Sequence, residues 1–256
     1  MTVLRVAAAQ VSTGPDPVAN LAIALDAIQQ AAAAGAELIA LPEATLACFG
    51  IDLSSVAEPL DGPFATGLRK VAADLGVVVA AGLFEPSSDG RVHNTLLVTG
   101  PGVEASYRKI HLYDAFGSRE SDTVAPGKEL VTFRWRDVTV GLATCYDLRF
   151  ADQFTALGRL GAELIVVPAS WGAGPGKEEQ WDLLTRARAA DAQAWLLACD
   201  QAYVPPSGND PLGIGRSSVS SPLGQTLARL DAAPGTLHTT IDTSVAAAVR
   251  ARVPIL

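Results

Sequence analysis

Cys145 follows an apolar stretch with the pattern of a buried strand, residues 137–144, and polar residues typical of a starting helix come directly after it. In open α/β folds, reactive groups collect at the carboxyl ends of strands, where the chain turns into a helix. A helix N-terminus at this point would stabilise the thiolate, which is the nucleophilic form of cysteine. Many free cysteines are instead inert core residues, and Cys48 and Cys199, which lie inside apolar runs, fit that interpretation.

Two other predicted strand ends carry groups that could assist a thiol. Glu43 follows the apolar stretch 38–42, and Lys109 ends the predicted strand 103–108. A carboxylate can accept the proton of the thiol and return it to a leaving amine. An ammonium and the backbone N–H of Tyr146 can stabilise the oxyanion formed when the sulfur attacks a carbonyl. Singly, a glutamate at a helix start and a solvated lysine are ordinary features, but together with the cysteine they predict acyl transfer through a thioester.

The motifs around these three residues resemble those of the nitrilase superfamily of carbon–nitrogen hydrolases. The motifs are Leu41–Ala44 (LPEA), Tyr107–Leu112 (YRKIHL) and Thr144–Phe150 (TCYDLRF), and the resemblance covers essentially the whole chain. It implies an α/β fold, a four-layer αββα sandwich of the nitrilase type, formed as a single carbon–nitrogen hydrolase domain over residues 1–256. It also implies a homodimer or a higher homo-oligomer.

The resemblance assigns a role to each matching residue. Glu43 corresponds to the general base, Lys109 to the oxyanion stabiliser and Cys145 to the nucleophile. The family carries a second glutamate, structural or catalytic, in the loop after the lysine. Arg119–Ser121 matches that position, so Glu120 is the fourth predicted catalytic residue.

Within the superfamily, three segments are similar to the Nit branch of amidases: His111–Asp114, Cys145–Phe150 and Pro168–Trp171. That branch includes ω-amidase and deaminated glutathione amidase, which cleave the terminal amide of small 2-oxo acid amides. The resemblance therefore implies hydrolysis of a small carboxylate-bearing amide through a cysteine thioester, with release of ammonia. Cleavage of an N-carbamoyl group or of a nitrile by the same residues is an alternative, and so is a catalytically silent binding or assembly protein.

Four residues near these motifs are predicted to bind the amide substrate. Arg149, four positions after the cysteine, could bind a substrate carboxylate through two hydrogen bonds, or form a structural ion pair with Asp147 or Asp152. Trp171 could line the acyl pocket or act as a packing lid, and Arg119 is a second candidate for anion binding. The predicted substrate-binding residues are Tyr146, Arg149, Trp171 and Arg119.

No metal or cofactor site is predicted. The three histidines, His93, His111 and His238, lie far apart, and no His/Cys spacing resembles a zinc site. Neither a Walker loop nor a Rossmann glycine motif follows a predicted strand. His111 raises the alternative of a Cys–His pair of the papain type, but its place inside the lysine motif favours a role in ordering a loop.

The composition limits the class of protein. The chain has 256 residues, of which 49% are hydrophobic, and no Pro/Gly/Ser-rich linker divides it, which favours one domain. The net charge of −8, without a Lys/Arg cluster, disfavours a nucleic-acid partner. Polar residues interrupt the Ala-rich run at 21–41, which argues against a membrane span, and no signal peptide is recognised. Three cysteines make no disulfide framework, so we expect a reducing, cytoplasmic location.

A repeated segment predicts two similar halves. Residues 35–43 (GAELIALPE) are echoed by residues 161–169 (GAELIVVPA), and each copy follows a predicted helix, 20–34 or 151–160. Each copy has a glycine where the helix ends and a proline that ends a short strand, so Glu43 should lie at a strand end equivalent to that of the second copy. Further strands are predicted at 77–84, 95–99, 103–109, 195–202, 215–220 and 237–241, helices at 63–75 and 178–193, and a long loop at 110–128.

Overall fold

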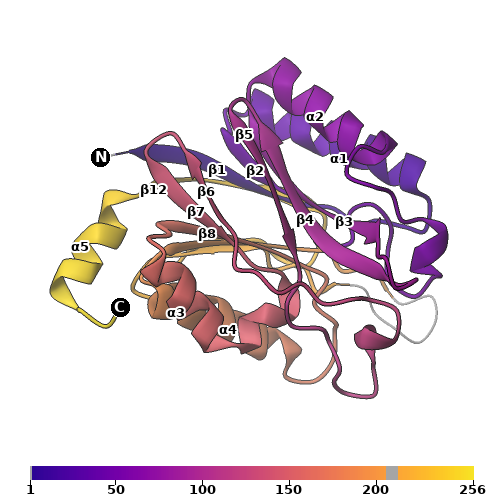
Figure 1. Cartoon of the computed structure of the whole chain (residues 1–256). Coiled ribbons are helices and arrows are strands. Elements are labelled where there is room, and N and C mark those ends of the chain that lie inside the picture. Colours follow the sequence, from indigo (N-terminus) through magenta and orange to yellow (C-terminus); the bar gives the residue numbers. More distant parts are fainter. Residues whose placement is uncertain (1, 206–212) are drawn as a thin grey trace.

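The computed structural model describes residues 2–205 and 213–256 of the chain. Two six-stranded sheets pack face to face, and two helices cover the outer face of each sheet (Figure 1). This arrangement confirms the four-layer αββα sandwich that the sequence predicted. The outer helices are α1 (Pro17–Ala33) and α2 (Pro63–Leu75) on one side, and α3 (Ala151–Arg159) and α4 (Lys177–Ala192) on the other.

The first sheet combines the N-terminal strands with one strand from the C-terminal part of the chain. Its order is β12-β1-β2-β3-β4-β5, and the central strands β1, β2 and β3 are parallel. The strands are β1 (Val3–Gln10), β2 (Leu38–Ala40), β3 (Val78–Pro86), β4 (Val92–Gly100), β5 (Val103–Arg108) and β12 (Gly235–Asp242).

The second sheet repeats this plan with the following strands. Its order is β11-β10-β9-β8-β7-β6, and β7, β8 and β9 are parallel. The helix α5 (Ser244–Arg252) lies at one end of the sandwich (Figure 1). The strands are β6 (Thr132–Trp135), β7 (Val138–Leu142), β8 (Leu164–Ala169), β9 (Trp195–Asp200), β10 (Ser218–Ser220) and β11 (Thr226–Arg229).

Alternating residues of each central strand belong to different cores. In β9, Trp195, Leu197 and Cys199 pack between the two sheets, whereas Leu196 and Ala198 pack against α3 and α4. This follows from the two-residue period of a strand, and it explains why the central strands are continuous apolar runs. Cys199 is fully buried in the core between the sheets, as predicted.

The repeated segment of the sequence forms equivalent parts of the two halves. α1 leads into β2, which lies between parallel neighbours, and α3 leads into β8 in the same way. Gly35 and Gly161 follow these helices with φ of +92° and +89°, a backbone conformation that favours glycine. The predicted pseudo-symmetry is confirmed by this topology.

The structure also corrects several sequence-based expectations. The edge strands β6 and β11 and the helix α5 were not predicted, because short edge elements carry little hydrophobic periodicity. The strand predicted at 215–220 contains only β10, since positive φ at Gly215 and Arg216 interrupts the extended chain before it. The loop predicted at 110–128 contains one short 3-10 helix, Glu120–Asp122.

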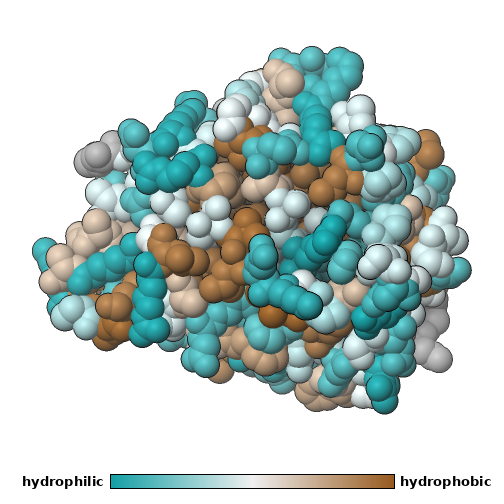
Figure 2. All heavy atoms as spheres, in the orientation of Figure 1, coloured by the Kyte–Doolittle hydropathy of each residue, from teal (hydrophilic) through white to brown (hydrophobic). Residues whose placement is uncertain are grey.

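Hydrophobic residues are not confined to the interior. On the face seen in Figure 2, they gather between the two helical layers, where edges of the sheets reach the surface. Among the described residues, no helix is both long enough and apolar enough to cross a bilayer.

Candidate active site

The ends of strands from both sheets meet at one cavity. Glu43 follows β2, Lys109 follows β5, Cys145 follows β7 and Ser170 follows β8. All four line a cavity of about 630 Å³. The three residues that the sequence placed at separate strand ends are therefore neighbours in space.

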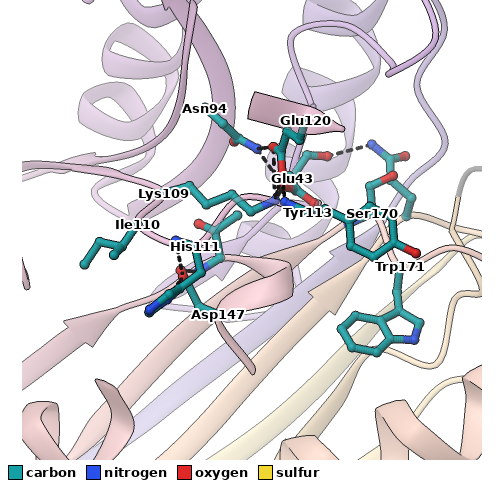
Figure 3. A network of polar contacts seen from close by, with 12 residues as sticks. Glu43, Asn94, Lys109, Ile110, His111, Tyr113, Glu120, Asp147, Ser170 and Trp171 are labelled. Atoms are coloured by element: carbon teal, nitrogen blue, oxygen red, sulfur yellow. Dashed lines mark hydrogen bonds and ion pairs between the residues drawn. The ribbon is translucent and has the colours of Figure 1, made fainter. Parts of the chain in front are cut away.

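Lys109 lies at the centre of a buried group of charges. Its Nζ donates to Glu43 Oε1 at 2.9 Å and to Glu120 Oε2 at 2.9 Å (Figure 3). The exposed fractions of the three side chains are 2% for Lys109, 1% for Glu43 and 8% for Glu120. Charges this deeply buried are tolerated only when they are paired and hydrogen-bonded.

Further donors hold the carboxylate of Glu43 in one position. Asn94 Nδ2 on β4 donates to Glu43 Oε1 at 2.7 Å, and the backbone N–H of Ser170 donates to Oε2 at 2.9 Å. Gly82 on β3 allows this arrangement, because a Cβ at that position would lie 2.8 Å from the Cα of Glu43. The Glu43 side chain is thus fixed by contacts from both sheets.

Glu120 reaches the same cluster from the long loop. Its Oε2 accepts a hydrogen bond from the backbone N–H of Tyr113 at 2.6 Å, and its Oε1 accepts one from Asn94 Nδ2 at 3.2 Å. Asn94 therefore bridges the two carboxylates that flank Lys109. Glu120, predicted as the fourth catalytic residue, thus lines the same cavity as Glu43 and Lys109.

Cys145 starts a short 3-10 helix, Cys145–Arg149, rather than an α-helix. Its φ is +47°, a left-handed conformation that is unfavourable for a side chain other than glycine and is often found at functional sites. Asp147 Oδ2 accepts a hydrogen bond from the backbone N–H of Thr144 at 2.8 Å and so stabilises the start of the turn. The turn places the thiol in the cavity with only 7% of the residue exposed.

Asp147 also connects this turn to the lysine motif. It accepts hydrogen bonds from the Tyr107 hydroxyl at 2.6 Å, from His111 Nδ1 at 2.9 Å and from the backbone N–H of His111 at 3.1 Å. The His111 ring stacks on Phe150 with 3.6 Å between the ring centroids. His111 therefore orders the loop, as predicted, and is engaged with Asp147 rather than with the thiol (Figure 3).

The surroundings of Cys145 favour the neutral thiol. Burial raises the pKa of Cys145 well above its usual value, and the negative charge of Glu43 raises it further, while the positive charge of Lys109 lowers it. The expectation that a helix N-terminus stabilises a thiolate here is wrong, because α3 begins only at Ala151 and the thiol lies against a carboxylate. The sulfur thus needs a base before it can attack.

Lys109 stays positively charged despite its burial. Burial alone would lower the pKa of Lys109, but the charges of Glu120 and Glu43 raise it well above its usual value. Cys145 lies within electrostatic range of the same ammonium. A fixed positive charge beside the sulfur suits the stabilisation of a developing oxyanion.

The predicted substrate-binding residues form another part of the cavity wall. The Arg149 guanidinium lies 5.1 Å from the ring centroid of Trp171 and 5.7 Å from that of Tyr146. Its Nη2 donates to Gln180 Oε1 at 2.6 Å. Trp171 is 4% exposed and packs on Trp181, with ring centroids 5.5 Å apart. It therefore lines the cavity and also belongs to the hydrophobic core behind the cavity wall.

The structure also shows the surroundings of Arg149 and Arg119, the two arginines predicted to bind an anion. Within residues 2–205 and 213–256, Arg149 forms no ion pair, so the alternative pairing with Asp147 or Asp152 is wrong. Asp147 is instead occupied by the Cys145 turn and by His111. Arg119 lines the rim of the cavity, but its side chain is 74% exposed and its Nε lies 3.4 Å from Asp122.

Comparison with known proteins identifies the family. The sequence model of the family described as carbon-nitrogen hydrolase matches residues 5–251. This chain belongs to the carbon–nitrogen hydrolase family. The motifs at Glu43, Lys109 and Cys145 all lie within the matched residues, and the predicted resemblance to the nitrilase superfamily is confirmed.

Relatives of this carbon–nitrogen hydrolase match over almost its full length. Hydrolase Rv0480c of Mycobacterium tuberculosis is 48% identical over 99% of this chain and 94% of that protein. Deaminated glutathione amidase of Escherichia coli O157:H7 is 36% identical over 93% of this chain and 90% of that protein. The crystal structure of XC1258 from Xanthomonas campestris, a CN-hydrolase superfamily protein, has a TM-score of 0.86 and 28% identity, and the match covers 99% of this chain and 96% of that one.

Sequence reasoning missed several groups that this carbon–nitrogen hydrolase uses to build the site. Asn94 could have been noticed as a polar residue inside the apolar stretch of β4, and Ser170 lies within the Pro168–Trp171 motif. The backbone N–H of Tyr113 gives no sequence signal, because its role depends only on the path of the loop. Lys177, which also lines the cavity, lies at the end of a glycine-rich segment, residues 172–177, and was not predicted as a site residue.

Proposed function

We propose that this carbon–nitrogen hydrolase cleaves a small carboxylate-bearing amide through a thioester on Cys145. The proposal is carried by one observation: the thiol lies against a buried carboxylate, Glu43, and a buried ammonium, Lys109, that hydrogen-bond to each other. Acyl transfer needs a nucleophile, a base and an oxyanion stabiliser, and these residue types supply all of them.

In the first half of the reaction, Glu43 accepts the proton of the Cys145 thiol while the sulfur attacks the amide carbon. The Lys109 ammonium and the Tyr146 N–H stabilise the oxyanion of the tetrahedral intermediate. The C–N bond then breaks, and Glu43 passes the proton to the leaving nitrogen, so that ammonia departs. The raised pKa of Cys145 makes this proton transfer necessary.

In the second half, water replaces ammonia. Glu43 accepts a proton from the water, whose oxygen attacks the thioester carbon. The same donors stabilise the second oxyanion. The C–S bond breaks, the sulfur regains a proton from Glu43, and the product leaves as a carboxylic acid.

Glu120 is assigned a positioning role in this mechanism. It contacts the Lys109 ammonium but neither Cys145 nor the base directly, and its charge helps to keep the pKa of Lys109 high. Asn94 supports the same arrangement by donating to both Glu43 and Glu120. Glu120 and Asn94 thereby hold the Glu43 carboxylate and the Lys109 ammonium in position beside the Cys145 sulfur.

The carboxylate on the proposed substrate is supported by the cavity wall. Arg149 lies in the cavity beside Tyr146 and Trp171, where a guanidinium can bind a carboxylate. The relative from Escherichia coli is named a deaminated glutathione amidase, which agrees with an amidase activity in this chain. N-carbamoyl compounds and nitriles remain alternatives for the same residues, and ammonia release from a matched panel of amides, N-carbamoyl amino acids and nitriles separates them.

The decisive test is the replacement of Cys145. We expect Cys145→Ala to lower ammonia release from amides such as succinamate by a factor of about 10⁴ or more, while circular dichroism shows an unchanged fold. Cys48→Ala is the matched control, since Cys48 does not line the cavity and should turn over normally. Mass spectrometry of the quenched wild type should find an acyl adduct on Cys145. A normal rate in Cys145→Ala would contradict the mechanism.

A further inference from the structure

One wall of the cavity carries two positively charged side chains, Arg149 and Lys177. Arg149 ends the Cys145 turn, and Lys177 begins α4. Both line the cavity, and within residues 2–205 and 213–256 neither forms an ion pair. Lys177 was not among the predicted site residues.

The Arg149 side chain is held in place, but not all of its N–H donors have a hydrogen-bond partner. Its Nη2 donates to Gln180, and its guanidinium lies beside the rings of Tyr146 and Trp171. Its Nε is buried and has no hydrogen-bond partner in the described part of the chain. A buried donor without a partner is costly, so an acceptor from a ligand would stabilise this side chain.

Lys177 is held against aromatic rings rather than against an acid. Its Nζ lies 4.0 Å from the ring centroid of Phe116 and 3.4 Å from the hydroxyl of Tyr113. Burial lowers the pKa of Lys177, the charge of Arg149 lowers it further, and the Cys145 sulfur has the opposite effect. The ammonium is thus within electrostatic range of both the second cation and the nucleophile.

Arg216, a cation in the same half of the molecule, differs from these two residues because it has acidic partners. Arg216, whose side chain is 17% exposed, donates to Glu178 at 3.0 Å and also pairs with Asp182. Arg149 and Lys177 instead repel each other in a partly desolvated space. Such an arrangement is stabilised when an anion enters, because the ligand then supplies the missing counter-charge.

We infer that Lys177 and Arg149 together bind the terminal carboxylate of the substrate, and that Lys177 is a specificity-determining residue. The inference rests on the proposed function and adds to it a second cation, Lys177, that selects for the carboxylate of the substrate. The carboxylate lies between the two cations, and the amide carbon lies at the Cys145 sulfur. Apolar side chains also line part of the cavity, including Phe49, Ile51 and Leu53, and suit the aliphatic part of such a substrate.

The first experiment compares two substrates that differ only at the far end. Succinamate carries a carboxylate where butyramide carries a methyl group. We expect Lys177→Met to lower the ratio of kcat/KM for succinamate to that for butyramide by about tenfold or more, mainly through KM, because a charged hydrogen bond is lost. Lys177→Arg should restore most of the ratio. Lys70→Met removes a lysine charge on α2, outside the cavity, and is the matched control.

The second experiment measures binding without turnover. In a Cys145→Ala background, calorimetry should give a Kd for succinamate that rises about tenfold with Lys177→Met and does not change with Lys70→Met. An unchanged Kd for succinamate with Lys177→Met, or no binding of succinamate at all, would overturn the subsite. If the wild type hydrolyses neither amide, the proposed function fails, while this binding measurement still decides the subsite independently.

Discussion

The cavity has two charged regions that are built in opposite ways. Around Lys109, every charge has a partner: the ammonium contacts Glu43 and Glu120, and Asn94 donates to both carboxylates. At the other wall, Arg149 and Lys177 line the cavity and form no ion pair with any residue that the structure describes. The first region is complete without a substrate, whereas in our proposal the substrate carboxylate completes the second. We interpret the difference as a division between reaction chemistry and substrate selection.

Removing Lys109 should have the largest effect, because it breaks the paired region. Lys109→Met leaves Glu43 and Glu120 as two buried carboxylates without a counter-charge. We expect the free energy of unfolding to fall by about 3–5 kcal/mol and amidase activity to be lost. Urea unfolding and ammonia release measure these effects. The double variant Lys109→Met with Glu120→Gln should recover part of the stability but no activity, and a lack of any recovery would argue against charge repulsion as the cause.

Replacing Glu43 should distinguish its role as proton acceptor from the effect of its negative charge on the pKa of Cys145. Glu43→Gln is expected to lower kcat by about 10²–10⁴ because the proton acceptor is lost. The same change removes a negative charge that raises the pKa of Cys145, so the thiolate should form at lower pH than in the wild type. The pH dependence of iodoacetamide labelling at Cys145, followed by mass spectrometry, measures this shift. A midpoint that moves to higher pH would contradict the proposed relation between the two residues.

Removing Lys177 should have the smallest effect on the free energy of unfolding, in contrast to the removal of Lys109. Lys177→Met deletes a half-buried charge that has no acid partner among the described residues and is repelled by Arg149. We expect the free energy of unfolding to change by no more than about 0.5 kcal/mol. Urea unfolding beside Lys109→Met gives the direct contrast. A loss as large as that of Lys109→Met would mean that Lys177 is a structural residue.

The elements that carry apolar patterns could be predicted from the sequence, and so could the residues at their ends. Glu43, Lys109 and Cys145 stand out because each follows an apolar strand, and Glu120 was found through the family motif. The single domain over residues 1–256, the homo-oligomer and the cytoplasmic location stay predictions. The edge strands β6 and β11 were missed because short exposed strands lack a clear pattern.

The contacts that complete the site could not be predicted, because they depend on tertiary packing. The donors to Glu43 come from β4 and from the residue after β8, which are distant in the chain. The raised pKa of the Cys145 thiol likewise depends on burial and on Glu43 from the other sheet. The proximity of Lys177 and Arg149 follows from the way α4 packs on the Cys145 turn.

The hydrogen bond from Ser170 to Glu43 has a consequence for folding. It joins the ends of the two repeated segments, and each segment belongs to a different sheet. A half-molecule could form its own helices and strands, yet its acid or its sulfur would lack the opposing half. Hydrolytic competence therefore requires that one sheet has docked upon the other.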